Sequence, residues 1–96
     1  MAQPLEKEVL DEALSALEGW TVEDDKLKKE FKFENFKEAM AFMVRLSYEA
    51  EKQVHHPELF NVYNTVQIGL ATHDAGDKIT EKDVQLAKTI ESLYNK

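Results

Sequence analysis

Residues 62–70 read Val-Tyr-Asn-Thr-Val-Gln-Ile-Gly-Leu, and this stretch decides the fold class. Positions 62, 66, 68 and 70 are apolar, whereas positions 63, 65, 67 and 69 hold Tyr, Thr, Gln and Gly. This period of two predicts a strand with one buried face and one exposed face. The buried face needs a covering layer, which the rest of the chain must supply.

Helical and extended patterns precede this strand. Apolar residues recur at helical spacing from Leu5 to Leu17, and Gly19 is placed to end that helix. Residues 20–33 alternate around a turn at residues 23–26, which predicts a hairpin.

A second helix is predicted to begin after Asn35, whose side chain can cap it. It is expected to end at His56, because Pro57 disfavours the helical conformation in the residue before it. Its expected buried stripe comprises Phe36, Ala39, Met40, Met43, Leu46 and Ala50.

The last helix follows Thr80, which with Asp83 has the T-x-x-D spacing of a capping box. Its expected buried face comprises Leu86, Ala87, Ile90, Leu93 and Tyr94. Helices mixed with antiparallel strands predict an α+β domain of two layers, with the helices covering one face of the sheet. We expect residues 1–96 to form this single domain.

Composition narrows the classes of function. Twelve basic and nineteen acidic residues give a net charge of −7, which argues against nucleic acid and anionic membranes as partners. There is no cysteine, and no apolar stretch is long enough to span a membrane, so we expect a cytoplasmic protein. A chain of 96 residues has a small core, so we expect a homo-oligomer that buries further apolar surface.

All three histidines lie close together in the sequence. His55 and His56 stand at the expected helix end, and His73 follows the strand. Histidines are favoured at a helix C-terminus simply because their cation interacts with the negative end of the helix dipole. His73 could likewise be an ordinary exposed loop residue. A functional role gains support from Glu51, because a carboxylate four residues before His55 can hold its imidazole in one tautomer.

A zinc site is the sharper rival interpretation of the three histidines. Three imidazoles and a water would make a catalytic zinc centre. The side chains of adjacent residues usually diverge, however, and the chain has no H-x-H or H-E-x-x-H motif. We therefore expect no metal. Asp83 is expected to act chiefly as the helix cap.

Taken together, the motif Glu51-Lys52-Gln53-Val54-His55-His56-Pro57, followed by Tyr63, His73 and Asp83, resembles the signature of the pterin-4a-carbinolamine dehydratases. The likeness covers most of residues 20–91. It implies three helices on one face of a four-stranded antiparallel sheet, and dimers or tetramers. It also implies dehydration of a 4a-hydroxytetrahydropterin, left by aromatic amino acid hydroxylases, to quinonoid dihydropterin, with no metal or organic cofactor.

The resemblance also implies roles for particular residues. His55 and His73 would carry out acid/base catalysis, in an order that the sequence leaves open, and His56 would mainly bind and orient the substrate. Glu51 and Asp83 would support them. The pterin is expected to contact Val54, His55, His56 and Pro57 on one side and Ala71, Thr72, His73 and Asp74 on the other.

Two positions depart from the family pattern. The loop at residues 76–80 is longer by one residue than in many members, and Leu59 stands where tryptophan is common. Some relatives also serve as dimerisation cofactors of a homeodomain transcription factor, so a protein-interaction module is the alternative function. Three intact histidines favour the enzyme, because a binding module does not need them.

Overall fold

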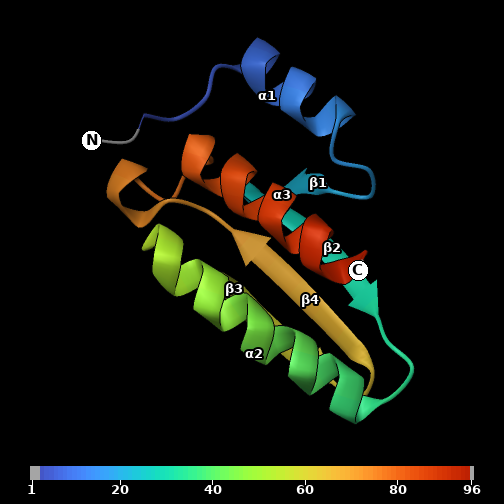
Figure 1. Cartoon of the computed structure of the whole chain (residues 1–96). Helices are drawn as coiled ribbons and strands as arrows, with labels where there is room; N and C mark the ends of the chain where they lie inside the picture. Colours follow the sequence, from blue (N-terminus) through green and yellow to red (C-terminus); the bar gives the residue numbers. More distant parts are fainter. Residues whose placement is uncertain (1–2, 96) are drawn as a thin grey trace.

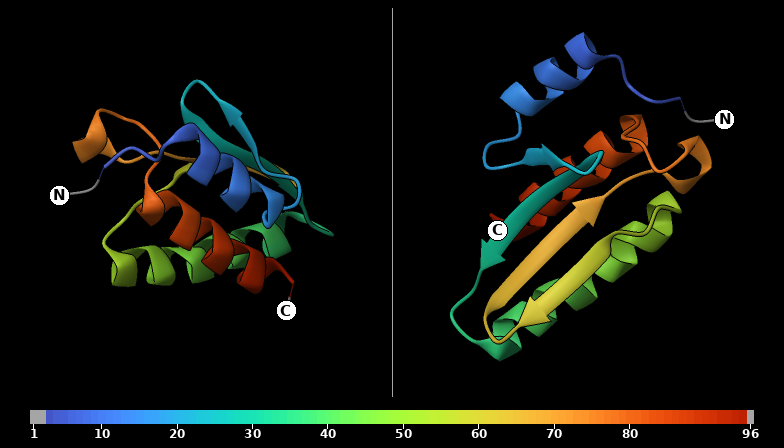
Figure 2. Two further views of the ribbon diagram at one scale, coloured as in Figure 1. Left: turned by 90° about the horizontal axis from the view of Figure 1, so that it is seen from above. Right: turned by 180° about the vertical axis from the view of Figure 1, so that it is seen from behind.

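Four antiparallel strands form one sheet in the computed structural model, which describes residues 3–95. The strands are β1 (Thr21–Glu23), β2 (Lys26–Lys32), β3 (Glu58–Val62) and β4 (Thr65–Leu70), in the spatial order β1-β2-β4-β3. Helices α1 (Lys7–Ser15), α2 (Phe36–Gln53) and α3 (Glu81–Tyr94) lie on one face of this sheet (Figure 1). Seen from behind, the sheet stands in front of the helices (Figure 2). The predicted α+β fold is confirmed.

The hairpin of β1 and β2 turns at Asp24 and Asp25. Both residues have a positive φ, of 54° and 62°. Two left-handed residues in a two-residue loop match the twist of antiparallel strands, and aspartate tolerates this conformation better than most side chains. The hairpin therefore forms where the alternation predicted it.

The region expected to be one strand from Val62 to Leu70 is instead the second half of another hairpin. β3 ends at Val62, Tyr63 and Asn64 turn the chain, and β4 begins at Thr65. The side-chain amide of Asn61 donates to the backbone carbonyls of Tyr63 and Thr65, at 3.2 and 2.9 Å. These bonds stabilise a turn that the apolar alternation did not reveal.

Helix α2 begins as predicted, because the side chain of Asn35 accepts a hydrogen bond of 2.9 Å from the backbone N–H of Glu38. Its end differs from the prediction. The helix stops at Gln53, and Val54 takes a left-handed conformation with φ 51° and ψ 46°. Pro57 thus does not set the boundary, which lies three residues earlier than expected.

The predicted stripe of α2 was partly wrong. Phe36 and Met40 are 49% and 40% exposed, whereas Phe42, which the stripe omitted, is fully buried. The buried positions are Ala39, Phe42, Leu46 and Ala50, which follow the i, i+3, i+4 spacing of a single face. An exposed apolar row remains on the other side of α2.

The core lies between the sheet and the helices. Phe31 sits near its centre, where its ring meets those of Trp20, Phe42 and Tyr94 with centroids 4.8–6.0 Å apart. Such tilted and edge-to-face pairs add to the stability given by apolar burial. The other core residues are Leu17, Leu27, Ala39, Leu46, Val66, Ile68, Leu70, Ile79, Val84, Leu86, Ala87 and Ile90. Within residues 3–95, no helix combines the length and apolar character that crossing a bilayer requires.

Candidate functional site

The three histidines meet at one end of the molecule. There the C-terminal end of α2, the end of β4, the short 3₁₀ helix His73–Ala75 and the N-terminus of α3 come together (Figure 1). The left-handed Val54 turns the chain out of α2 directly before His55 and His56. The backbone N–H of His55 still donates to the carbonyl of Ala50, at 3.0 Å, which fixes the turn.

A cavity of about 260 Å³ at this end, which we call the imidazole cavity, brings the predicted residues together. Its lining residues are Val54, His55, His56, Ala71, Thr72, His73, Asp74 and Lys82. Of the eight expected pterin contacts only Pro57 does not line it. The expectation that three imidazoles share one cleft therefore agrees with the geometry.

His55 is the buried member of the three and is held by Asp83. Its Nε2 lies 2.5 Å from Oδ1 of Asp83, which is completely buried. Because a carboxylate only accepts hydrogen bonds, this contact places a proton on Nε2. The other ring nitrogen, Nδ1, makes no hydrogen bond to residues 3–95. Because no fully buried side-chain polar atom in this part of the chain lacks a partner, the unpaired Nδ1 is not fully buried. Nδ1 is therefore free to serve the cavity as an acceptor.

Asp83 is itself fixed by two donors to its second carboxylate oxygen. Oδ2 accepts from the backbone N–H of Thr80 and from the hydroxyl of Thr72, each at 2.8 Å. The hydroxyls of Thr72 and Thr80 are 2.6 Å apart. The predicted capping box is thus confirmed, and the same carboxylate also orients His55. Thr72 has its hydroxyl committed to this network, so the side chain offers little to a substrate.

The partner predicted for Glu51 was wrong. Glu51 was expected to hold His55, but its Oε1 lies 2.5 Å from Nε2 of His56. The helical (i, i+4) geometry does not reach His55, because α2 has already ended and Val54 has turned the chain. Both side chains are exposed, at 76% for Glu51 and 66% for His56. This outer pair is therefore more solvated than the His55–Asp83 pair.

His73 lines the same cavity from the 3₁₀ helix His73–Ala75 and is almost fully solvated. Its side chain is 92% exposed, and Nδ1 lies 3.2 Å from Oδ1 of Asp77. Asp77 belongs to the loop at residues 76–80, and it has a positive φ of 59°. That loop therefore supplies a carboxylate for His73. Its Nε2 atom makes no hydrogen bond to residues 3–95.

Lys82 is a site residue that the sequence interpretation missed. It is the second residue of α3, one before Asp83, and lines the imidazole cavity. Its position beside the helix cap gave the only available signal. Within the described residues 3–95, no group of three or more His, Asp or Glu side chains is placed to hold a metal ion.

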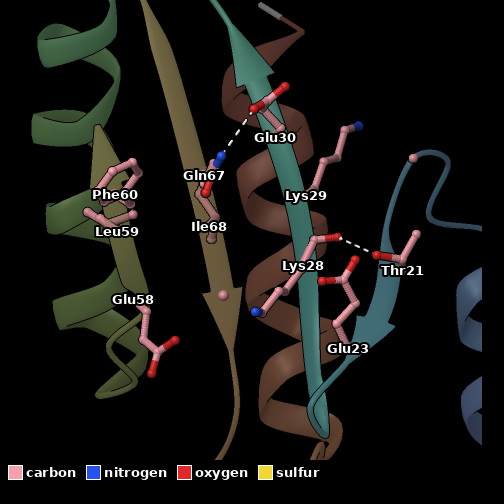
Figure 3. A pocket seen from close by; sticks show the side chains of 12 residues that line it. Thr21, Glu23, Lys28, Lys29, Glu30, Glu58, Leu59, Phe60, Gln67 and Ile68 are labelled. Carbon is pink, nitrogen blue, oxygen red and sulfur yellow. Dashed lines mark hydrogen bonds between the residues drawn. The ribbon is translucent and has the colours of Figure 1, made fainter. Parts of the chain in front are cut away.

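A larger cavity lies on the open face of the sheet and has different chemistry. It measures about 440 Å³ and is lined by strand residues such as Thr21, Lys28, Glu30 and Gln67. Figure 3 shows these side chains standing on β1, β2 and β4, with Phe60 and Glu58 on β3. None of its lining residues is a histidine, so acid/base chemistry is better supported at the imidazole cavity.

The sequence of the chain is similar to a known protein family and to curated proteins of two bacteria. Residues 3–93 match the family model described as pterin 4 alpha carbinolamine dehydratase. A curated protein of Opitutus terrae with the provisional name pterin-4-alpha-carbinolamine dehydratase is 51% identical over 84 residues, covering 88% of this chain and 87% of its own. One from Christiangramia forsetii with the same provisional name is 45% identical, covering 97% and 95% of the two chains.

Solved structures agree with the fold. A transcriptional coactivator/pterin dehydratase from Brucella melitensis superposes with a TM-score of 0.91 at 38% identity, covering 96% of this chain and 99% of its own. A pterin dehydratase-like protein described as a RuBisCO assembly factor gives a TM-score of 0.63 at 22% identity, covering 78% and 86%. The second likeness concerns the fold alone.

Proposed function

Because the chain belongs to the pterin-4a-carbinolamine dehydratase family, we propose that it removes water from a 4a-hydroxytetrahydropterin and releases a quinonoid dihydropterin. The reaction would serve tetrahydrobiopterin recycling after aromatic amino acid hydroxylation. The observation that carries the proposal is the meeting of His55, His56 and His73 at one cavity, with His55 oriented by the buried Asp83.

The reaction needs one proton acceptor and one proton donor. The N5–H bond gives up its proton, its electron pair forms the C4a=N5 double bond, and the C4a–O bond breaks as the leaving oxygen is protonated to water. Imidazoles can fill both roles near neutral pH. Two histidines that line one cavity from different elements suit a substrate whose two reacting groups are on neighbouring ring atoms.

We assign the acceptor role to His55. Asp83 holds its Nε2–H, so Nδ1 faces the substrate with a free lone pair. The Asp83 carboxylate also stabilises the positive charge that His55 gains when it takes the N5 proton. Asp83 acts through His55 and is therefore a positioning residue.

His73 is then the proton donor. Asp77 accepts from Nδ1, which leaves Nε2 to deliver a proton to the leaving oxygen. The high exposure of His73 lets bulk water reprotonate it after each turnover. His56, held by Glu51, would bind and orient the ring rather than transfer protons.

A turnover assay tests the proposal directly. The carbinolamine is generated in situ by an aromatic amino acid hydroxylase, and formation of quinonoid dihydropterin is followed against the spontaneous rate. We expect the wild-type chain to accelerate dehydration and a His55→Ala/His73→Ala double variant to lose most of that acceleration. A wild-type rate equal to the spontaneous rate would instead favour the protein-interaction module.

We also propose that the chain works as a homo-oligomer, a dimer or a tetramer. The exposed row on α2 consists of Phe36, Met40, Val44 and Tyr48, which are 49%, 40%, 51% and 69% exposed. Residues four apart form a ridge that packs well against a second helix. In an antiparallel pair of α2 helices, Phe36 would face Tyr48 of the other copy. The row is thus self-complementary in shape.

A further inference from the structure

The loop that carries His73, residues 73–78, is closed at its base by backbone hydrogen bonds. We call it the His73 loop. The backbone N–H of Thr72 donates to the carbonyl of Lys78, at 2.8 Å, and the carbonyl of Thr72 accepts from the N–H of Asp77, at 3.1 Å. These bonds close the loop on itself, so they do not fix it against the rest of the fold.

One side-chain contact holds the His73 loop against another part of the fold. Nζ of Lys78 lies 2.8 Å from Oδ2 of Asp25, in the turn between β1 and β2. Within the described residues 3–95, no other side chain of residues 73–78 forms a hydrogen bond or ion pair with a residue outside the loop. The ion pair therefore ties the β1–β2 turn to the His73 loop, and we call it the Asp25–Lys78 clamp.

The charged neighbours of the clamp have partners of their own. Oδ2 of Asp24, the other residue of the turn, lies 3.8 Å from Nζ of Lys28 on β2. Nζ of Lys26 lies 2.8 Å from Oε2 of Glu58 on β3. Asp25 is thus the turn carboxylate that the His73 loop contacts, and its removal leaves the other two ion pairs in place.

His73 and Asp77 need the clamp because both side chains are exposed. Nδ1 of His73 lies 3.2 Å from Oδ1 of Asp77, and the two side chains are 92% and 66% exposed. A pair between exposed side chains contributes little energy of its own. The direction of the His73 Nε2 atom, which donates the proton in the proposed mechanism, therefore depends on where the backbone of the loop lies.

Resting on the proposed function, we propose that Asp25 and Lys78 are positioning residues for proton transfer by His73. The clamp fixes the backbone of the His73 loop, so that Asp77 stays within reach of Nδ1 and Nε2 stays at the imidazole cavity. Neither Asp25 nor Lys78 lines that cavity, so neither needs to touch the substrate. Loss of the clamp should consequently lower kcat, which depends on the position of the donor, more than it raises KM.

Two variants remove the clamp in different ways. Lys78→Met removes the ammonium group, and Asp25→Gly removes the carboxylate while placing glycine at a position whose φ of 62° suits it. We expect each variant to lower kcat by about two- to fivefold, the size expected from the loss of one exposed ion pair, with KM nearly unchanged. Because Asp25→Gly should not weaken the turn, chemical denaturation should show no loss of stability to explain its lower kcat. Lys78→Arg, which can keep the ion pair, should have wild-type kcat.

A double variant and a second background show whether the clamp acts through His73. Lys78→Met combined with Asp25→Gly should lose no more kcat than either change alone, because both changes break one contact. In a His73→Ala background, Lys78→Met should have no further effect. Asp24→Asn is the matched control, because it removes the same charge from the same turn, tolerates the positive φ and leaves the clamp intact. It should keep wild-type kcat.

Wild-type kcat in both Lys78→Met and Asp25→Gly, or an equal loss by Lys78→Met in the His73→Ala background, would overturn the inference. Amide ¹⁵N order parameters give a readout that needs no turnover. Those of residues 73–78 should fall in both clamp variants and not in Asp24→Asn. Order parameters that stay at the wild-type level would overturn the inference and leave the proposed function standing. Absence of wild-type turnover would instead overturn the proposed function, and the catalytic purpose of the clamp with it.

Discussion

Nε2 of His55 and Oδ1 of Asp83 lie 2.5 Å apart, and this contact joins the end of α2 to the first turn of α3. Asp83 serves two purposes with its two oxygens. Oδ2 completes the capping box of α3 and accepts from Thr72, while Oδ1 orients the imidazole. Oδ2 accepts two hydrogen bonds, from Thr72 and Thr80. A hydrogen-bond donor in its place, such as an amide NH₂ group, would lose both bonds.

Asp83→Asn should therefore reverse the tautomer of His55. The amide oxygen must stay at the Oδ2 position to accept from Thr72 and Thr80, which places the NH₂ group against Nε2. Nε2 would then accept, and Nδ1 would carry the proton where the substrate needs an acceptor. We expect kcat to fall by about 10²–10⁴-fold with little change in KM. Steady-state kinetics and ¹⁵N NMR of the imidazole measure both effects.

A Thr80→Ala variant is the control for that prediction, because it weakens the helix cap without placing a donor against His55. It should lower the free energy of unfolding by about 1 kcal/mol and leave the tautomer unchanged. An Asp83→Asn variant with wild-type kcat would contradict the positioning role.

Single histidine variants should separate proton transfer from binding. His55→Ala and His73→Ala should lower kcat more than they raise KM, because the lost interaction strengthens in the transition state. His56→Ala should act mainly through KM, and Glu51→Gln more mildly in the same way, since Glu51 contacts His56. The losses should be partial, because the substrate also dehydrates without enzyme. Wild-type kcat in both His55→Ala and His73→Ala would refute the assignment.

Local patterns predicted the parts of the fold that depend on neighbouring residues. The spacing of Thr80 and Asp83 correctly predicted the capping box of α3, and Asn35 correctly predicted the start of α2. The Tyr63–Asn64 turn was missed because an apolar alternation continues on both sides of it. Tyrosine with a φ of 51° is also an unusual turn residue, so only Asn64 carried a signal.

The partners of the histidines depend on contacts between distant residues. His55 and Asp83 are 28 residues apart, and the short spacing between Glu51 and His55 favoured the wrong pair. The left-handed Val54 ends the helical spacing one residue before His55, and such a conformation is not expected for a β-branched residue. Lys82 lies in the first turn of α3, and Asp77 lies in the loop before it. No local sequence motif marks either residue as part of the site.

Exhaustive chelation should leave turnover unchanged. The described residues 3–95 hold no group of three His, Asp or Glu side chains arranged for a metal ion, and each imidazole faces a carboxylate of its own. The measurement is the dehydration rate after dialysis against a strong chelator, with a buffer-only sample as the control. Loss of turnover that added zinc restores would reverse the assignment of a metal-free mechanism.

A charge in the exposed row of α2 should dissociate the homo-oligomer. Val44 lies in the middle of the row, so Val44→Glu would bury a carboxylate against an apolar partner surface. We expect a shift to the monomer in analytical ultracentrifugation. Gln85→Glu, which adds the same charge on an exposed position of α3, should keep the wild-type mass. A wild-type monomer, or a Val44→Glu variant of unchanged mass, would argue against this interface.

Val54→Gly should stabilise the fold. Val54 is 76% exposed and holds φ 51°, so its side chain contributes little burial while its backbone is in a region that costs an ordinary residue about 1–2 kcal/mol. Glycine removes this cost, and its own greater freedom in the unfolded chain offsets roughly 0.5–1 kcal/mol of the gain. A net increase of up to about 1 kcal/mol in the free energy of unfolding should raise Tm by roughly 4–8 °C.

The same substitution at Val9 is the matched control for Val54→Gly. Val9 is also about half exposed but lies inside α1, where glycine is less favourable than valine. Val9→Gly should therefore lower the free energy of unfolding by roughly 0.5 kcal/mol, so the two variants should differ in sign. Chemical denaturation of both variants and the wild type decides the matter. Destabilisation by Val54→Gly would mean that the valine side chain makes a contact, such as one within an oligomer, that outweighs the strain of its backbone.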